Sequence, residues 1–422
     1  MRSVHGMKTE AKDVNRRKVY RRGFIRGAAI AGAGLVLGGG LLYGRRSLAA
    51  LLAGNQGSVD RAIRDHRRDQ MSDADAQAVV AAYMTGAPDK PRVIHVHSGQ
   101  ATNWDFASGY YGDYVDQDVV NEMVDRGMQE LTDTSTVADA WRALIPTYAS
   151  GEAIAVKVNL NNSNRCSDDD IEIDALIHPV NAVVRGLKQI GVAEEDVWVY
   201  DAVRRIPYRF SDGCLYADVQ FFGGCRQSPG WSSNDPDAYV TFHRPSGSSP
   251  PSMRIPDVLI NAAYLINMPI MKTHDFAGVS LSFKNHLGTI IDPGELHDYI
   301  FPTWSRFGTD YNPLVDICKN PHVGAKTVLA IGDGLFGAWG GYVAPPMPWT
   351  TFGDEASNSL FFATDQVALD SVIYDFLAAE TTIMDNADCY LSLAADAGMG
   401  TFEHGDPWGS GYDQINYVRI EA

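Results

Sequence analysis

Residues 266–288 read INMPIMKTHDFAGVSLSFKNHLG, a strand-like apolar run that leads directly into cationic and polar side chains. The chain has only ten lysines among its 422 residues, yet Lys272 and Lys284 both fall within this stretch. His274 and His286 lie beside them. Scarce lysines gathered where an apolar strand ends indicate a binding site at the edge of a sheet.

The order of apolar patterns along the chain predicts an α/β fold. Strand-like runs occupy residues 92–97, 153–158, 197–200, 327–331 and 360–363. Segments with helical periodicity lie between them, at residues 116–131, 137–144, 179–190 and 366–379. Such alternation is typical of a mainly parallel sheet flanked by helices.

The domain organisation follows from breaks in this pattern. Residues 203–252 are rich in Gly, Ser, Pro and aromatic residues, so we expect them to form a β-rich insertion that flanks the sheet. Residues 54–91 are largely polar and are expected to form a linker and an N-terminal helix near residues 74–84. We therefore assign residues 92–422 to an α/β domain.

The composition restricts the class of protein and its partners. A hydrophobic content of 45% and a charged content of 21% are typical of a globular protein. The net charge of −17 disfavours nucleic acid as a partner, because phosphate binding needs a basic face. The five cysteines include no C-x-x-C pair, so no iron–sulfur cluster is expected in this chain. In an oxidising compartment Cys214 and Cys225 could form a disulfide, and free buried thiols are the equally open alternative.

The N-terminal segment 1–53 has the pattern of an export signal. Basic residues concentrated in 16–26 precede the weakly apolar residues 27–43, which is the secretory arrangement. Arg21 and Arg22, followed by Phe24, resemble the twin-arginine export motif. We therefore expect the twin-arginine export machinery as a partner and a location in the periplasm or at the cell exterior. Contact with the membrane is expected only through this segment, which is either cleaved or kept as a tether.

Polar or charged side chains end each of the predicted strands. They are Lys157 and Asn159, Asp201, Lys272 and His274, Asp333, and Thr364 and Asp365. In open α/β sheets ligands bind outside the carboxyl ends of the strands, so we expect these side chains to meet at one edge. The structural alternative is that Asp201, Asp333 and Asp365 cap helices and open turns.

The residue types at this edge favour a small anionic ligand or cofactor. Ammonium groups suit a carboxylate or a phosphate, and polar side chains add hydrogen bonds. If a helix begins near Ala277, Gly278 lets the backbone approach the ligand, and Ser280 and Lys284 share one helical face. The candidate catalytic residues are His274, Lys272 and Lys284, and the candidate ligand-binding residues are Lys157, Asn159, Gly278, Ser280 and Asn285.

A divalent cation could bridge the protein to such an anion, because carboxylate oxygens are the ligands that hard cations prefer. Pairing of the same carboxylates with the lysines, as a structural salt-bridge network, is the alternative. His95 and His97 alternate along a strand and are expected to have structural partners. The candidate metal ligands are Asp201, Asp333, Asp365 and His286.

Several of these motifs together resemble one family. They are Val-Lys157-Val-Asn159, His178-Pro179, Asn267-Met-Pro269-Ile-Met-Lys272-Thr-His274, Gly278 to Asn285, Asp333-Gly334 and Thr364-Asp365. In their order and spacing they resemble the domain-of-unknown-function 362 family over residues 92–395. The sequence departs from the family pattern in residues 203–252 and at His286. The series Lys272, Gly278, Asn285 and His286 is also remotely similar to lactate-racemase-type enzymes that carry a nickel-pincer cofactor.

The resemblance implies a site centred on residues 272–285, but the family has no settled reaction. From the residue types we expect an exported enzyme that binds a small anionic ligand or cofactor at the strand ends and uses metal-assisted or redox chemistry. A non-catalytic extracytoplasmic binding protein with the same cleft is the alternative.

Overall fold

The computed structural model describes residues 90–168, 170–300, 309–341 and 343–422. The predicted export signal in residues 1–53 and the predicted helix near residues 74–84 lie outside the described residues. Across the described ranges, no helix combines the length and the apolar character that a membrane crossing requires.

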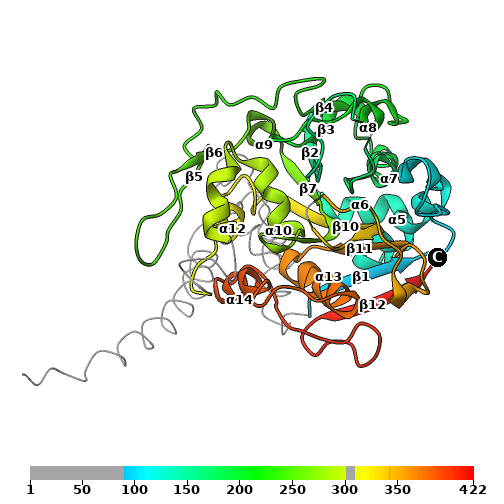
Figure 1. The fold of residues 1–422 in the computed structure, drawn as a ribbon. Coiled ribbons are helices and arrows are strands. Elements are labelled where there is room, and N and C mark those ends of the chain that lie inside the picture. Colours follow the sequence, from blue (N-terminus) through cyan, green and yellow to red (C-terminus); the bar gives the residue numbers. More distant parts are fainter. Residues whose placement is uncertain (1–89, 169, 301–308, 342) are drawn as a thin grey trace, which may run out of the picture.

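A ten-stranded sheet forms the centre of the described part of the chain (Figure 1). Its main path runs β12-β1-β11-β10-β7-β2-β3-β4, and β8 and β9 extend it from β10. The bounds of these strands are β1 Arg92–His97, β2 Ile154–Val158, β3 Val197–Tyr200, β4 Gln220–Phe222, β7 Tyr264–Met268, β8 Ile270–His274, β9 Gly278–Val279, β10 Thr327–Ala338, β11 Ser359–Ala363 and β12 Asn416–Glu421.

The sheet is mainly parallel, which confirms the predicted α/β class. The strands β10, β7, β2, β3 and β4 are parallel neighbours, and β1 is parallel to β12. β11 is antiparallel to both of its neighbours, β1 and β10. Its carboxyl end therefore points to the edge of the sheet opposite to the carboxyl ends of β2, β3 and β7.

Alternating residues along the strands divide the core into two layers, one on each face of the sheet. In β11, Leu360 and Phe362 belong to one layer, and Phe361 and Ala363 belong to the other. The first layer is covered by α5, α6 and α7, and the second by α13 with α10, α12 and α14 (Figure 1). The helices are α5 Gln117–Thr132, α6 Val137–Leu144, α7 Ile177–Lys188, α8 Tyr208–Asp212, α9 Asp257–Asn261, α10 Ser282–Asn285, α11 His297–Ile300, α12 Pro313–Lys319, α13 Gln366–Glu380 and α14 Cys389–Asp396.

Side-chain caps explain where the longer helices begin. Asp116 accepts hydrogen bonds from the first turn of α5, and Thr136 does the same for α6. Asp365 accepts hydrogen bonds from Val367 N and Ala368 N at the start of α13. Each cap satisfies backbone N–H groups that have no partner within the helix.

The histidines of β1 have structural partners, as expected. His95 Nδ1 contacts the Tyr417 hydroxyl at 2.8 Å, and its Nε2 contacts Ser359 Oγ at 2.8 Å. His97 Nδ1 pairs with the Glu421 carboxylate at 2.6 Å. Both imidazole rings therefore join β1 to its neighbouring strands.

The segment 203–252, predicted to be a β-rich insertion, contains only short elements. β4 joins the edge of the main sheet beside β3, so the segment does flank the sheet. β5 (Tyr239–Val240) pairs with β6 (Met253–Arg254), and α8 supplies a short helix. Most of the segment is irregular, because its many prolines and glycines interrupt strands and helices.

Of the two alternatives left open for Cys214 and Cys225, the disulfide between them is not formed, and only Cys214 is a free thiol. Cys225 is bonded to Cys166, with their Cα atoms 5.5 Å apart, and Cys214 is a free thiol. The fold brings the loop after β2 beside the turn after β4, where Tyr208 N donates to the Cys166 carbonyl at 2.8 Å. Sequence proximity favoured the shorter loop, whereas the tertiary contact determines the partner.

Candidate functional site

A cleft of about 290 Å³ lies beyond the carboxyl ends of β2, β3 and β8. It contains much of the predicted site, because residues that follow all three strands contribute to it. The predicted residues that line it are Asn159, Asp201, His274, Ser280, Lys284 and Asn285. The lining residues outside the predicted set of site residues are Asn161, Val203, Arg204, Phe276, Leu287, Gly288, Pro293 and His297.

Lys157 lies beneath this cleft and is held in an ion pair. It is fully buried, and its Nζ donates to Asp201 Oδ2 at 3.1 Å and to Asn285 Oδ1 at 2.9 Å. The other Asp201 oxygen accepts from Val203 N at 3.0 Å and from Arg204 N at 2.8 Å. Burial lowers the pKa of Lys157, and the attraction of Asp201 opposes that shift. Lys157 and Asp201 therefore pair with each other inside the protein, as in the alternative of a structural salt-bridge network.

Gly288 leaves room for this ion pair. A Cβ atom at this position would lie 2.6 Å from Lys157 Nζ and 2.9 Å from Asp201 Oδ2. The backbone of residue 288 also holds the loop after β3, because Ala202 N donates to the Gly288 carbonyl at 2.8 Å. Position 288 therefore requires glycine, because the Lys157–Asp201 ion pair lies too close to its Cα atom for a side chain.

Asparagines and one aspartate fix the short helix α10 that carries Lys284. Asn285 Nδ2 donates to Asn267 Oδ1 at 2.7 Å, and Asn267 Nδ2 donates to the Ser282 carbonyl at 2.9 Å. Asp370 of α13 accepts from Ser282 N at 2.8 Å and from Phe283 N at 3.2 Å. Burial raises the pKa of Asp370 to about 6, although these hydrogen bonds favour its charged form. The network supplies the N-terminal cap of α10 from another helix.

The predicted helix start near Ala277 is wrong. Gly278 and Val279 form strand β9, and α10 begins only at Ser282. Gly278 has φ +77°, and a Cβ there would lie 2.1 Å from the Ala387 Cβ, so this glycine serves packing rather than ligand approach. Ser280 lies between the two elements, and its hydroxyl accepts from Asn159 Nδ2 at 3.2 Å. Ser280 and Lys284 both line the cleft, but they do not share a helix.

Lys284 differs from Lys157 in its surroundings. It is 6% exposed and lines the cleft. Within the described ranges, no hydrogen bond or ion pair reaches its ammonium group. Burial lowers the pKa of Lys284 to about 7, and the positive charges of Lys272, Arg204 and Lys157 add to that shift. At neutral pH the amine is therefore divided between its charged and its neutral form.

His274 lines the same cleft as a neutral hydrogen-bond donor. Its Nδ1 accepts from Phe276 N at 3.1 Å and from Ala277 N at 3.3 Å. Burial holds the pKa of His274 well below its usual range, and the charges of Lys284 and Lys272 act in the same direction. The proton of the neutral ring is thus on Nε2, which can donate but cannot accept a proton.

Lys272 is fully buried and is not one of the residues that line the cleft. Burial lowers the pKa of Lys272 to about 8, and the charges of Asp174, Glu172 and Asp275 oppose that shift. Glu172 belongs to a second cleft of about 250 Å³, which shares Asn161 and Arg204 with the first. The second cleft is lined by Asn161, Asn162, Asn164, Arg165, Asp168, Asp170, Glu172, Arg204 and Val343.

Three of the predicted metal ligands do not reach the cleft. Asp333 lies within β10 and accepts from Leu176 N at 3.4 Å, and burial raises its pKa to about 6. The prediction that Asp365 lies at the same edge of the sheet as the cleft is wrong. β11 is antiparallel to β10, so its carboxyl end lies at the opposite edge. His286 is fully buried with Nδ1 3.2 Å from Thr289 Oγ1, and burial lowers its pKa to about 3. The structure does not bring these groups together around one ion.

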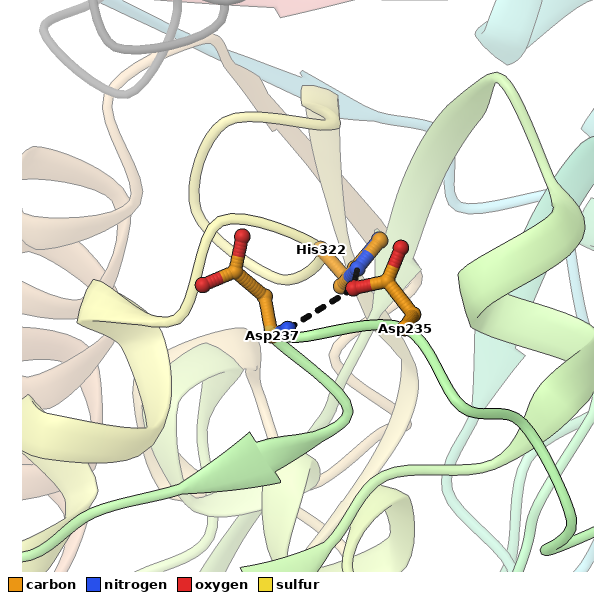
Figure 2. Close-up of side chains that lie close together, drawn as sticks. All are labelled: Asp235, Asp237 and His322. Carbon is orange, nitrogen blue, oxygen red and sulfur yellow. Dashed lines mark hydrogen bonds and ion pairs between the residues drawn. The ribbon is translucent and has the colours of Figure 1, made fainter.

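A different set of potential metal ligands gathers between the loop 235–237 and the turn after α12 (Figure 2). Among the described residues, Asp235, Asp237 and His322 offer ligand atoms within 4.8 Å of one another. His322 Nε2 contacts Asp235 Oδ1 at 2.9 Å. The sequence analysis missed this group, because His322 is far along the chain from Asp235 and Asp237 and the three residues match no spacing template.

We compared the chain with solved structures, with curated proteins and with family models. The solved structures that match include the lactate racemase apoprotein from Thermoanaerobacterium thermosaccharolyticum, with 14% identity and a TM-score of 0.35 over 63% of this chain. They also include a protein from Thermotoga maritima, with 10% identity and a TM-score of 0.33 over 67% of this chain. The matches span 56% and 59% of those chains, less than two thirds of either. No match was found among curated proteins.

The family model described as "Domain of unknown function (DUF362)" matches residues 154–375. This range runs from β2 to α13 and includes the residues that line the cleft. It covers more than half of the 422 residues. The chain therefore belongs to the DUF362 family.

Proposed function

We propose that the cleft beyond β2, β3 and β8 binds a small anionic ligand, a carboxylate or a phosphate, and that the protein is an enzyme acting on it. The observation that carries the proposal is Lys284, a lysine that is 6% exposed and whose ammonium contacts no carboxylate in the described part of the chain. A buried charge is costly unless it is paired. A bound anion would supply the missing partner.

Other residues of the cleft support an anionic ligand. Arg204 adds a guanidinium group, which is suited to planar carboxylate and phosphate groups. Neutral polar groups come from His274, Asn159 and Ser280. The imidazole of His274 carries its proton on Nε2. A volume of about 290 Å³ fits a metabolite of a few heavy atoms.

Part of the cleft wall is apolar. Val203, Phe276, Leu287 and Pro293 line it together with the charged groups. An apolar wall opposite cationic side chains favours a ligand that has a charged end and a short hydrocarbon body.

Lys284 is the group best suited to move a proton in this cleft. General acid–base groups work best when their pKa lies near the pH at which the enzyme operates. Burial lowers the pKa of Lys284 to about 7, whereas His274 is held neutral with a protonated Nε2. Among the candidate catalytic residues, Lys284 is therefore the acid–base group, and His274 orients the ligand as a hydrogen-bond donor.

We also propose that the protein works outside the cytoplasm. The twin-arginine pattern at Arg21 and Arg22 supports export, and the disulfide between Cys166 and Cys225 is a bond that persists in oxidising compartments. Replacing Arg21 and Arg22 by lysine should retain the protein in the cytoplasm, as measured by cell fractionation. Unchanged export of that variant would contradict the proposal.

The enzymatic proposal is tested on natively purified protein. Bound small molecules are extracted and identified by mass spectrometry, and a panel of short carboxylates and phosphates is then assayed for turnover by the wild type and by Lys284→Met. We expect an anion in the extract and turnover that the variant lacks. Binding without turnover for every anion tested would favour a non-catalytic binding protein, and the absence of any anion binding would refute the proposal.

A further inference from the structure

Lys284 extends from a short helix whose neighbouring residues are anchored by hydrogen bonds. Its helix, α10, is anchored at its first turn by Asp370, whose carboxylate also accepts from the Tyr390 hydroxyl at 3.0 Å. The next residue, Asn285, is fixed by Asn267 and by Lys157. The side chain of Lys284 thus begins from a backbone that is fixed on both sides, and it lines the cleft.

The three buried lysines of this region differ in the carboxylates around them. Lys157 is paired with Asp201 at 3.1 Å. Lys272 lies in the field of Asp174, Glu172 and Asp275. The ammonium group of Lys284 contacts no carboxylate among the described residues, and the charges of Lys272, Arg204 and Lys157 add to the lowering of its pKa. A lysine that is desolvated and placed beside other cations is activated as a nucleophile, because its neutral amine is favoured.

The same cleft holds groups that could orient a carbonyl substrate beside that amine. Arg204 provides a site for a carboxylate, and His274 provides a neutral N–H donor for a carbonyl oxygen. The apolar wall with Phe276 and Leu287 leaves room for a short carbon chain. A nucleophilic amine, a carboxylate site and a carbonyl donor are the components that imine formation needs.

We propose that Lys284 forms an imine with the carbonyl carbon of a small oxo acid. The inference rests on the anion-binding function proposed above, and it names the substrate class and the covalent step. The neutral Nζ attacks the carbonyl carbon and forms a C–N bond, and the carbonyl oxygen takes up a proton. Loss of one water molecule from the resulting carbinolamine gives the C=N bond. The amine and the carbonyl compound are joined with release of water, so no oxidant or reductant is consumed.

Reductive trapping tests the proposal. The full chain, with its disulfide intact, is incubated at neutral pH with limiting glyoxylate and cyanoborohydride, and the modified lysines are located by peptide mass spectrometry. We expect carboxymethylation of Lys284 at least about tenfold faster than that of the exposed Lys319, because Lys284 lines the cleft that holds the glyoxylate and burial lowers its pKa to about 7. Oxalate, which has the carboxylates but no aldehyde, should protect Lys284 and leave Lys319 unprotected.

Two variants separate the covalent step from ligand binding. Lys284→Arg keeps a positive charge but should abolish the fast adduct, whereas Lys319→Arg should leave the adduct at Lys284 unchanged; thermal unfolding verifies that both variants fold. If oxalate binds in calorimetry but Lys284 reacts no faster than Lys319, the imine is refuted while anion binding stands. If neither oxalate nor any other anion binds, both proposals fail together.

Discussion

Lys157 and Lys284 lie at the same edge of the sheet, and both are buried, but their surroundings are opposite. Lys157 donates to Asp201 at 3.1 Å and to Asn285 at 2.9 Å, so its charge is balanced inside the protein. Lys284 lines the cleft among other cations, with no carboxylate contact in the ranges that the structure describes. The ion pair of Lys157 stabilises the fold. The surroundings of Lys284 disfavour its charged form, so part of its amine is neutral at about pH 7. We infer that the partner of a buried lysine, and not its burial, separates the structural role of Lys157 from the functional role proposed for Lys284.

Removing each lysine should have a different effect on stability. Lys157→Met leaves Asp201 as an unpaired buried carboxylate, so we expect the free energy of unfolding to fall by about 3–5 kcal/mol. Lys284→Met removes a desolvated charge without leaving a partner behind, and we expect no loss of stability. Urea denaturation of both variants beside the wild type measures the difference. Equal losses of unfolding free energy in the two variants would contradict the distinction between a paired Lys157 and a Lys284 that has no carboxylate partner among the described residues.

The space around the ion pair gives a second test, with a smaller effect. Gly288→Ala places a Cβ 2.6 Å from Lys157 Nζ, and we expect a loss of about 1–3 kcal/mol. Gly294→Ala is the matched control, because a Cβ at that position meets nothing within 4 Å. Thermal or urea unfolding compares the two. A Gly288→Ala protein as stable as the control would mean that the Lys157–Asp201 pair is not tightly confined.

The smallest expected effect is on pH dependence. The pKa of Lys284 lies near 7 in the fold, below the ordinary lysine value of 10.5, so the unfolded chain binds more protons between these values. The stability of the unliganded protein should therefore rise with pH across that interval relative to Lys284→Met. Anion affinity should do the opposite and fall as the pH rises through about 7, because the anion needs the protonated amine. Calorimetric titrations at several pH values measure the second trend, and a pH-independent affinity would contradict it.

The strands and the general place of the site could be predicted from the sequence. β1 and β3 have the expected bounds, because apolar runs bounded by turn residues specify strands locally. The cleft lies at strand ends, because parallel strands deliver the residues that follow them to the same edge. Asn159, Asp201 and His274 follow this rule.

The remaining features depend on tertiary contacts that the residue pattern does not contain. A strand has the same alternation in either direction, so the reversal of β11, which removed Asp365 from the site, could not be predicted. Which carboxylate meets which lysine is likewise decided by packing. Arg204 was missed although a signal existed: it lies three residues after Asp201, within the loop that follows β3. The loops after the strands carry as much of the site as the strand ends do.

The most direct test of the central claim is calorimetric titration of oxalate into three proteins at neutral pH: the wild type, Lys284→Met and the surface control Lys319→Met. If Lys284 is the buried cation that an anion completes, Lys284→Met should bind oxalate at least about tenfold more weakly, as expected for losing a hydrogen bond to a charged group. Lys319→Met should bind like the wild type. Equal affinity of Lys284→Met and the wild type would contradict the claim that this lysine holds the ligand.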